Sequence, residues 1–406
     1  MRVWRMRNRV MPYAWGSRSA LASLQGRPPA AQPEAELWMG AHPQAPSEVE
    51  VEGRAVPLPE LIAAQPEAIL GAEVMKHFGP TLPFLVKILA AERPLSLQVH
   101  PPAEIATAGF RAEDAAGIDR RAPWRTYRDP NAKPELLLAL GPFRALHGFA
   151  PPAESARRLE RLASKRLTPL VDRLRRGDPP GDVFLDLLAW PDDDRAALVA
   201  EAAAAAGTDS SPLASLVGSL SRLHPADPGV VGVLLLNYVE LSPGEALYIR
   251  PGELHAYLDG IGLEILGNSD NVVRAGLTEK HLALSELARS LCREPTPAHL
   301  LTATDDGRGG RCFAVRQDEF ALTVVEVADV PRELIPRSAE VLVVLDGAVR
   351  LETDDGVLPL GRTDSAFVAA DAGVLRLTGG GTVARVRPGV VVQCGAGAEQ
   401  TLEPQR

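Results

Sequence analysis

The stretch from residue 241 to residue 260, LSPGEALYIRPGELHAYLDG, decides the fold class of this chain. Short apolar runs alternate in it with the turn-forming pairs Pro243-Gly244, Pro251-Gly252 and Asp259-Gly260. Apolar runs bounded by such pairs are typical of β-strands joined by tight turns. The stretch therefore predicts β-structure, and it places His255 within it.

Two segments earlier in the chain also predict strands. In PLSLQVHP (Pro94–Pro101) apolar residues alternate with Ser96, Gln98 and His100, so the polar side chains share one face of a half-buried strand. ELLLALGPFRALHGF (Glu135–Phe149) predicts a strand pair around a Gly-Pro turn. Polar residues on strands with an apolar back are candidates for a site.

The chain changes character twice along its length. Residues 1–150 mix apolar runs with turns, whereas residues 151–225 are rich in arginine and carry apolar residues three and four apart. That spacing predicts three or four short amphipathic helices. Strand patterns return over residues 226–290, and a helix is predicted near the end of this stretch, at 278–292. Residues 308–406 show turns about every ten residues, which favours a sandwich or small barrel.

Composition narrows the class of protein. Of 406 residues, 46% are apolar and 23% are charged, which is typical of globular chains, and the net charge of −9 argues against a general nucleic-acid binder. The sequence has neither a signal-peptide apolar region nor a run long enough to span a membrane. Three cysteines without a C-x-x-C pair make a disulfide framework or a thiolate zinc site unexpected. We therefore expect a reduced, cytoplasmic protein.

Three groups of residues have the chemistry of metal ligands. Gln98 and His100 lie two residues apart and could face one ion, or simply form a polar outer face. Glu135 opens an apolar strand, where a carboxylate needs either a metal or a cationic partner such as Lys133. His255 follows Gly244 by eleven residues and is either a ligand or an ordinary hairpin histidine. Such nitrogen and oxygen ligands suit Zn²⁺ or non-haem iron.

A fourth group follows His255 in the segment GLEILGNSDNVVRAGLTEKHL (262–282). Ser269-Asp270-Asn271 is turn chemistry, Glu264 lies on the strand before it, and Arg274 follows. Without further context this segment predicts a polar loop with a solvated arginine.

Taken together, these motifs resemble the type I phosphomannose isomerase family along nearly the whole chain. The spacing from Gly244 to His255 also resembles the second motif of the cupin superfamily. The matching blocks, in the same order and spacing as in the family, are YAWGS (13–17), AELWMGAHPQAPS (35–47), LPFLVKILAAERPLSLQVHP (82–101), DPNAKPELL (129–137), FRALHGF (143–149), LNYVELSPGEALYIRPGELHAYL (236–258) and GLEILGNSDNVVRAGLTEKHL (262–282).

The resemblance implies a mainly β fold with a helical insert. Residues 1–150 and 226–300 would form two parts of a cupin-like jelly-roll catalytic barrel, and residues 151–225 a helical insert domain. Residues 308–406 would form a second, C-terminal cupin-like β domain. No histidine lies beyond His299, so a histidine-ligated metal is not expected in that last domain.

The resemblance also implies roles for individual residues. One Zn²⁺ per chain would be held by Gln98, His100, Glu135 and His255. Catalytic roles would fall to Arg274, Glu264, Lys133 and Asp270, and substrate-binding roles to Lys87, Ser96 and Trp15. We favour Glu264 as general base over Asp270 and His100, and we expect Arg274, Lys87 and Ser96 to contact the phosphate.

The implied activity is interconversion of mannose 6-phosphate and fructose 6-phosphate through an enediol, by a monomer that binds a small sugar phosphate and neither nucleic acid nor membrane. One departure is Ala132, where the family usually has histidine in N-H-K-P-E. Two alternatives stay open at this point: a non-catalytic sugar-phosphate-binding protein, and an iron-dependent cupin oxygenase.

Overall fold

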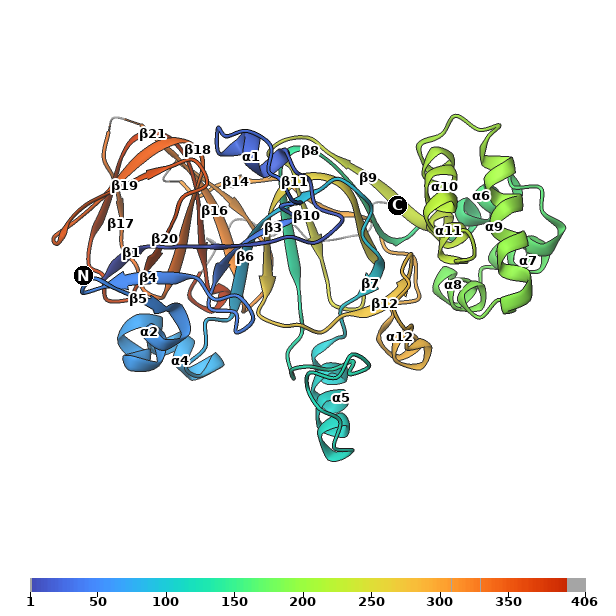
Figure 1. The fold of residues 1–406 in the computed structure, drawn as a ribbon, viewed down its shortest axis with the longest axis horizontal. Helices are drawn as coiled ribbons and strands as arrows, with labels where there is room; N and C mark the ends of the chain where they lie inside the picture. Colours follow the sequence, from blue (N-terminus) through green and yellow to red (C-terminus); the bar gives the residue numbers. More distant parts are fainter. Residues whose placement is uncertain (1, 308, 329, 393–406) are drawn as a thin grey trace.

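Two large antiparallel sheets form the body of the molecule in a computed structural model that describes residues 2–307, 309–328 and 330–392 (Figure 1). Within these residues one sheet has ten strands and the other has nine. The ten-stranded sheet comprises β2 (Arg9–Met11), β3 (Glu36–Gly40), β6 (Phe84–Ala91), β7 (Leu97–Val99), β8 (Glu135–Phe149), β9 (Leu236–Leu241), β10 (Ala246–Ile249), β11 (His255–Gly267), β12 (Val273–Gly276) and β13 (His299–Leu301).

The nine-stranded sheet is built almost entirely from the C-terminal part of the chain. It comprises β1 (Val3–Arg5), β14 (Thr304–Asp305), β15 (Gly310–Phe313), β16 (Ala321–Val327), β17 (Arg332–Leu334), β18 (Glu340–Thr353), β19 (Gly356–Gly361), β20 (Ser365–Val368) and β21 (Leu375–Arg387). The exception is β1, which pairs with β20 so that Val3 lies opposite Val368. The next strand, β2, pairs with β3 of the ten-stranded sheet, so the first strands of the chain join both sheets.

The helices lie around the two sheets, with one block at an end of the molecule and α5 (Ala103–Ala115) projecting away from the sheets (Figure 1). A helical block follows β8 and consists of α6 (Pro152–Glu160), α7 (Thr168–Arg175), α8 (Pro180–Leu188), α9 (Asp192–Ala206) and α10 (Pro212–Leu223). The other helices are α1 (Ala20–Leu24), α2 (Leu58–Ala64), α3 (Pro66–Leu70), α4 (Ala72–Phe78), α5 (Ala103–Ala115), α11 (Gly229–Gly232) and α12 (Leu284–Ser290). A short hairpin joins β4 (Glu48–Val51) to β5 (Arg54–Pro57). Every helix in the described part of the chain is too short or too polar to cross a lipid bilayer.

The mainly β architecture with a helical insert confirms the predicted fold class, but several elements differ from their predictions. The helical block has five α-helices instead of three or four, because prolines at the starts of α6, α7, α8 and α10 divide it into short pieces. The apolar run at 229–235 forms α11 and a 3₁₀ turn before β9 begins, and α12 is shorter than the helix predicted over 278–292. The domain boundaries inferred from composition stay predictions, and residues 308, 329 and 393–406 of the last domain lie outside the described residues.

The predicted strand pair at Glu135–Phe149 was wrong in one respect, because β8 runs through the Gly141-Pro142 step as one strand. Its first part pairs with β10 and its last part with β9, while β11 pairs with both. The pairing with β11 is irregular around Gly260, where Pro142 has no N–H to donate. The result is a bent strand that carries Glu135 at one end and His147 at the other.

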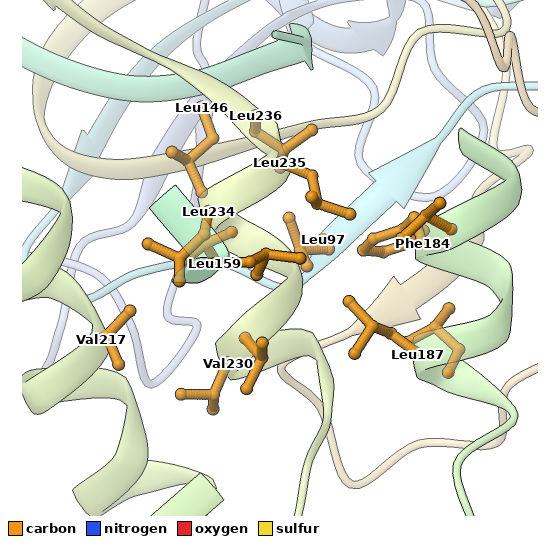
Figure 2. Packing of buried hydrophobic residues seen from close by; sticks show 14 of the residues in the cluster. Leu97, Leu146, Leu159, Phe184, Leu187, Val217, Val230, Leu234, Leu235 and Leu236 are labelled. Atoms are coloured by element: carbon orange, nitrogen blue, oxygen red, sulfur yellow. The ribbon is translucent and has the colours of Figure 1, made fainter. Parts of the chain in front are cut away.

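An apolar core connects the helical block to strand β7 (Figure 2). Leu97 and Val99 point away from the polar residues of their strand and are fully buried. Figure 2 shows Leu97 close to Phe184 and Leu187 of α8 and to Val230 of α11. The packing explains why β7 alternates: its apolar face belongs to the helical core, so Gln98 must face the opposite side.

Candidate metal centre and active site

Strands β7, β8 and β11 bring the four predicted metal ligands together. Gln98 pairs with His255 across β7 and β11, and its amide nitrogen lies 3.3 Å from His255 Nε2. Glu135 begins β8, with its two carboxylate oxygens 3.1 Å from His100 Nε2 and 3.4 Å from His255 Nε2. One ligand atom from each of His100, Glu135 and His255 lies within 4.8 Å of the others.

Backbone carbonyls fix the orientation of both imidazole rings. His100 Nδ1 lies 2.8 Å from the carbonyl of Asn271, and His255 Nδ1 lies 3.0 Å from the carbonyl of Glu253. A carbonyl can only accept, so each Nδ1 donates and each Nε2 carries its lone pair toward the centre. This arrangement of a ring held at one nitrogen is typical of metal-binding histidines.

The group of His100, Glu135 and His255 is suited to a metal ion by its burial, its charge and its unused ligand atoms. The three residues are at most 1% exposed, and neither His100 Nε2 nor Glu135 Oε2 has a hydrogen-bond partner. Burial lowers the pKa of His100 to about 4, which keeps its lone pair free. Burial opposes ionisation of Glu135, but Lys133, His100 and His255 together outweigh it and hold the pKa of Glu135 well below its ordinary value.

Lys133 accounts for only part of the charge balance at Glu135. Its ammonium lies 3.0 Å from Glu135 Oε1, so the cationic partner considered from the sequence is present. Glu135 Oε2 is nevertheless buried and unpartnered. Leaving a buried carboxylate oxygen without a donor is costly, and a metal ion would satisfy it together with the two histidines.

A second polar cluster lies on the neighbouring strands β3, β6 and β11. The ammonium of Lys87 lies 3.3 Å from Glu264 Oε2, 3.4 Å from Glu36 Oε1 and 4.9 Å from the centre of the Trp38 ring. Burial lowers the pKa of Lys87, but the two carboxylates reverse this and raise it above its ordinary value. Burial raises the pKa of Glu264. Tyr257, whose hydroxyl is buried, senses the charges of Glu264 and Glu135 and therefore lies in the same interior.

Three cations, Arg128, Arg274 and Lys280, lie near enough to influence one another's charge. Arg274 on β12 pairs with Gln98 of β7, and burial together with the charge of Arg128 lowers the pKa of its guanidinium. Arg274, burial and Arg128 in turn lower the pKa of Lys280. Among the described residues none of these three side chains has an ion-pair partner within 4 Å. Such a concentration of unpaired positive charge favours an anionic ligand.

The remaining predicted residues surround these clusters. Asp270 Oδ1 lies 3.3 Å from His42 Nε2, and its other oxygen accepts a hydrogen bond from Gln44 at 2.8 Å. Trp15 is half-buried and packs against the apolar cluster that contains Phe143 and Tyr257. Ser96 is half-buried directly before β7. The functional roles assigned to these three residues stay predictions.

Sequence reasoning did not single out several residues of this interior: Glu36, Trp38, His42, Arg128 and Tyr257. For two of them, Glu36 and Tyr257, the sequence contains a weak indication of a place in the site. Glu36 is a carboxylate within the apolar strand ELWMG, as Glu135 is within its own strand. Tyr257 lies two residues after His255, and therefore on the same face of β11.

Comparisons with known proteins agree with this geometry. The family model described as "Phosphomannose isomerase type I, catalytic domain" matches residues 3–152, and "Mannose-6-phosphate isomerase, cupin domain" matches residues 311–388. Mannose-6-phosphate isomerase from Escherichia coli K12 is 37% identical over 93% of this chain and 98% of its own length. The enzyme of that name from Homo sapiens is 30% identical over 93% of this chain and 96% of its own length.

Solved structures give the same result. A variant of phosphomannose isomerase from Salmonella typhimurium superposes with a TM-score of 0.90 at 36% identity, covering 96% of this chain and all of that one. A zinc-bound mannose 6-phosphate isomerase superposes with the same TM-score, identity and coverage. The strand arrangement, the buried His-Glu-His group and the similarity over almost the full length lead to one conclusion: the chain belongs to the type I phosphomannose isomerase family.

Proposed function

We propose that this protein interconverts mannose 6-phosphate and fructose 6-phosphate with one bound Zn²⁺. The observation that carries the proposal is the buried group of His100, Glu135 and His255, with two ligand atoms that have no partner. Family membership and the zinc-bound relative support the same reaction and the same metal. Gln98, whose amide lies beside His255, would complete the ligand set.

A bound Zn²⁺ would act as a Lewis acid toward the oxygens at C1 and C2, where negative charge develops. The ligand set has one carboxylate and three neutral groups, so the loaded site keeps about one positive charge. Lys133, which lies against Glu135 Oε1, adds a cation on the same side. An enediol with a negative oxygen is therefore stabilised by groups that are already in place before the reaction.

Glu264 is our candidate for the general base that moves the proton between C2 and C1. It lies on β11 in the interior that also holds Tyr257 and Lys87. Burial raises its pKa, which brings the carboxylate closer to the working pH, where proton transfer in both directions is efficient. Lys87 would hold the ionised form in position through its 3.3 Å contact. Asp270 is occupied by His42 and Gln44, and we propose a positioning role for it.

The three unpaired cations would bind the substrate phosphate. Arg128, Arg274 and Lys280 form a group whose mutual repulsion a dianionic phosphate would relieve. Lys87, which sequence reasoning also placed at the phosphate, is buried between two carboxylates. We therefore propose that Lys87 serves Glu264, and that Arg128 takes its place at the phosphate.

The alternatives have less support. An iron oxygenase would need open coordination positions, and Gln98, whose amide lies 3.3 Å from His255 Nε2, would be available to occupy one of them. A binding protein that has lost activity would be expected to have lost ligands, whereas Ala132 is the one departure in its motif and is not a ligand. We propose a cytoplasmic location, which the free Cys292 and Cys312 support; Cys394 lies outside the described residues. That the protein is a monomer stays a prediction.

The test is conversion of mannose 6-phosphate to fructose 6-phosphate by the purified protein, by the protein after chelation, and by the chelated protein after zinc is returned. We expect activity to disappear on chelation and to return with zinc. Zinc-loaded, folded protein without turnover would overturn the isomerase assignment. Binding of mannose 6-phosphate by that inactive protein would then favour the sugar-phosphate-binding alternative.

A further inference from the structure

A second buried cluster of titratable side chains lies behind the metal ligands and takes no part in the proposed reaction. Its centre is Glu253, whose carboxylate is 5% exposed. One oxygen lies 2.9 Å from His147 Nε2 and 2.8 Å from the amide nitrogen of Arg250, and the other lies 2.9 Å from His299 Nε2. Three donors from β8, from the turn before β11 and from β13 thus converge on one carboxylate.

The cluster is not a second metal site. Among the described residues the only group of ligand atoms close enough to share one ion is that of His100, Glu135 and His255. In the Glu253 cluster both histidine Nε2 atoms are already bonded to the carboxylate. The cluster is therefore closed by its own hydrogen bonds.

The backbone of the same turn holds both histidine ligands. The carbonyl of Glu253 accepts the hydrogen bond from His255 Nδ1 at 3.0 Å. One residue earlier, the amide of Gly252 donates to the carbonyl of His100 at 2.7 Å. Gly252 has a φ of +94°, so the turn has a shape that other residues adopt poorly. The conformation of this turn therefore sets where the two ligand rings lie relative to each other.

The Glu253 carboxylate holds the turn in its conformation. It accepts a hydrogen bond from the backbone amide of Arg250, within the turn itself. It also bonds to His147, which lies opposite His255 in the pairing of β8 with β11. His147 Nδ1 is buried and has no partner. A proton on that atom would be a buried unsatisfied donor, so the carboxylate also selects the Nε2–H tautomer of His147.

We propose that Glu253 is a positioning residue that orients His255, and through Gly252 also His100, for metal binding. His147 and His299 are its anchors. The inference rests on the proposed zinc site but does not depend on which reaction that site performs. Partners that orient a metal-binding histidine typically change metal affinity or activity about 10–100-fold when replaced, and we expect Glu253→Gln to weaken zinc binding by that amount.

The experiment measures zinc affinity directly, by competition with a chromophoric chelator, and records the visible absorption of the Co²⁺-substituted protein. Glu253→Gln is expected to weaken zinc binding and to change the Co²⁺ spectrum, which reports ligand geometry. The matched control is Glu340→Gln, which alters a buried carboxylate bonded to Arg385 in the other sheet. The control is expected to lower thermal stability without moving either metal readout.

Two variants of His299 keep the test decisive if Glu253→Gln does not fold. His299→Phe retains a ring and removes one donor, and it should weaken zinc binding several-fold. His299→Gln can still donate, and it should bind zinc more nearly like the wild type. Wild-type zinc affinity and an unchanged Co²⁺ spectrum in both Glu253→Gln and His299→Phe would overturn the inference. A wild-type protein that binds zinc but does not isomerise the sugar would overturn the proposed function alone.

Discussion

The two sheets of this protein each contain a buried carboxylate, but the two carboxylates differ in how completely their oxygens are hydrogen-bonded. In the ten-stranded sheet Glu135 begins the long strand β8, and one of its oxygens is left without a partner. In the nine-stranded sheet Glu340 begins the long strand β18, and both of its oxygens accept hydrogen bonds from Arg385 of β21 at 2.6 Å. Both carboxylates are 1% exposed.

This difference in hydrogen bonding separates a carboxylate that can bind a metal from one that only stabilises the fold. Arg385 supplies two parallel donors and completes the charge balance of Glu340 within the protein. At Glu135 a lysine and two histidines surround the carboxylate without saturating it. A site that binds a metal must keep bonding capacity unused after folding, whereas a structural site satisfies its polar groups during folding.

The largest effect should follow from removing the carboxylate charge of Glu135. Glu135→Gln removes the only anionic ligand, so zinc should be lost and kcat should fall about 10³-fold or more. Metal content by elemental analysis and the isomerase rate check this together. Glu340→Gln, the same change in the other sheet, should retain zinc and kcat; an equal loss in both variants would contradict the contrast between the sheets.

Replacing the candidate base should separate chemistry from metal binding. Glu264→Gln should retain zinc while kcat falls about 10²–10⁴-fold. In the wild type the base acts when ionised, and burial raises its pKa, so activity should fall with decreasing pH already above the ordinary pKa of a glutamate. The pH profile of kcat in the zinc-loaded protein measures this. A profile that stays flat down to the ordinary glutamate range would assign the base to another residue.

Removing a cation of the group formed by Arg128, Arg274 and Lys280 should affect substrate binding more than turnover. Arg128→Met or Lys280→Met removes a charged donor to the phosphate, so KM should rise about 10-fold or more with a smaller change in kcat. Lys165→Met, which alters an exposed lysine of the helical block, is the control and should leave KM unchanged. Unchanged KM in both Arg128→Met and Lys280→Met would place the phosphate elsewhere.

The smallest effect on activity is expected in the nine-stranded sheet. Arg385→Met leaves Glu340 buried without a partner, which should lower the free energy of unfolding by about 3–5 kcal/mol while kcat stays unchanged. Adding Glu340→Leu should recover much of that loss, because the uncompensated charge is then gone. Urea denaturation of the single and double variants measures both steps. A fall in kcat at temperatures where the variant is folded would show that the two sheets are coupled through this pair.

Local patterns predicted the strands that carry the metal ligands, because the face on which a residue lies depends only on spacing within its own segment. Gln98 and His100 face one side since they lie two residues apart, and Glu135 stood out as a carboxylate in an apolar strand. The partners of Lys87 could not be predicted in this way. Glu36, Lys87 and Glu264 meet because β3, β6 and β11 pair in one register, and that register is set by the whole sheet. Arg128 lies in a loop with no periodic pattern to mark it.

The pairing of β1 with β20 has a consequence for how the chain is made. Val3 is synthesised before its partner Val368, which follows more than 300 residues later. At about 5–20 residues per second, translation of that interval takes roughly 20–70 s. During this time Trp4, which stacks on Phe367 in the finished protein, has no native partner from β20. The order of synthesis therefore makes closure of the nine-stranded sheet a late event, and the nascent chain must keep its first strand from aggregating until then.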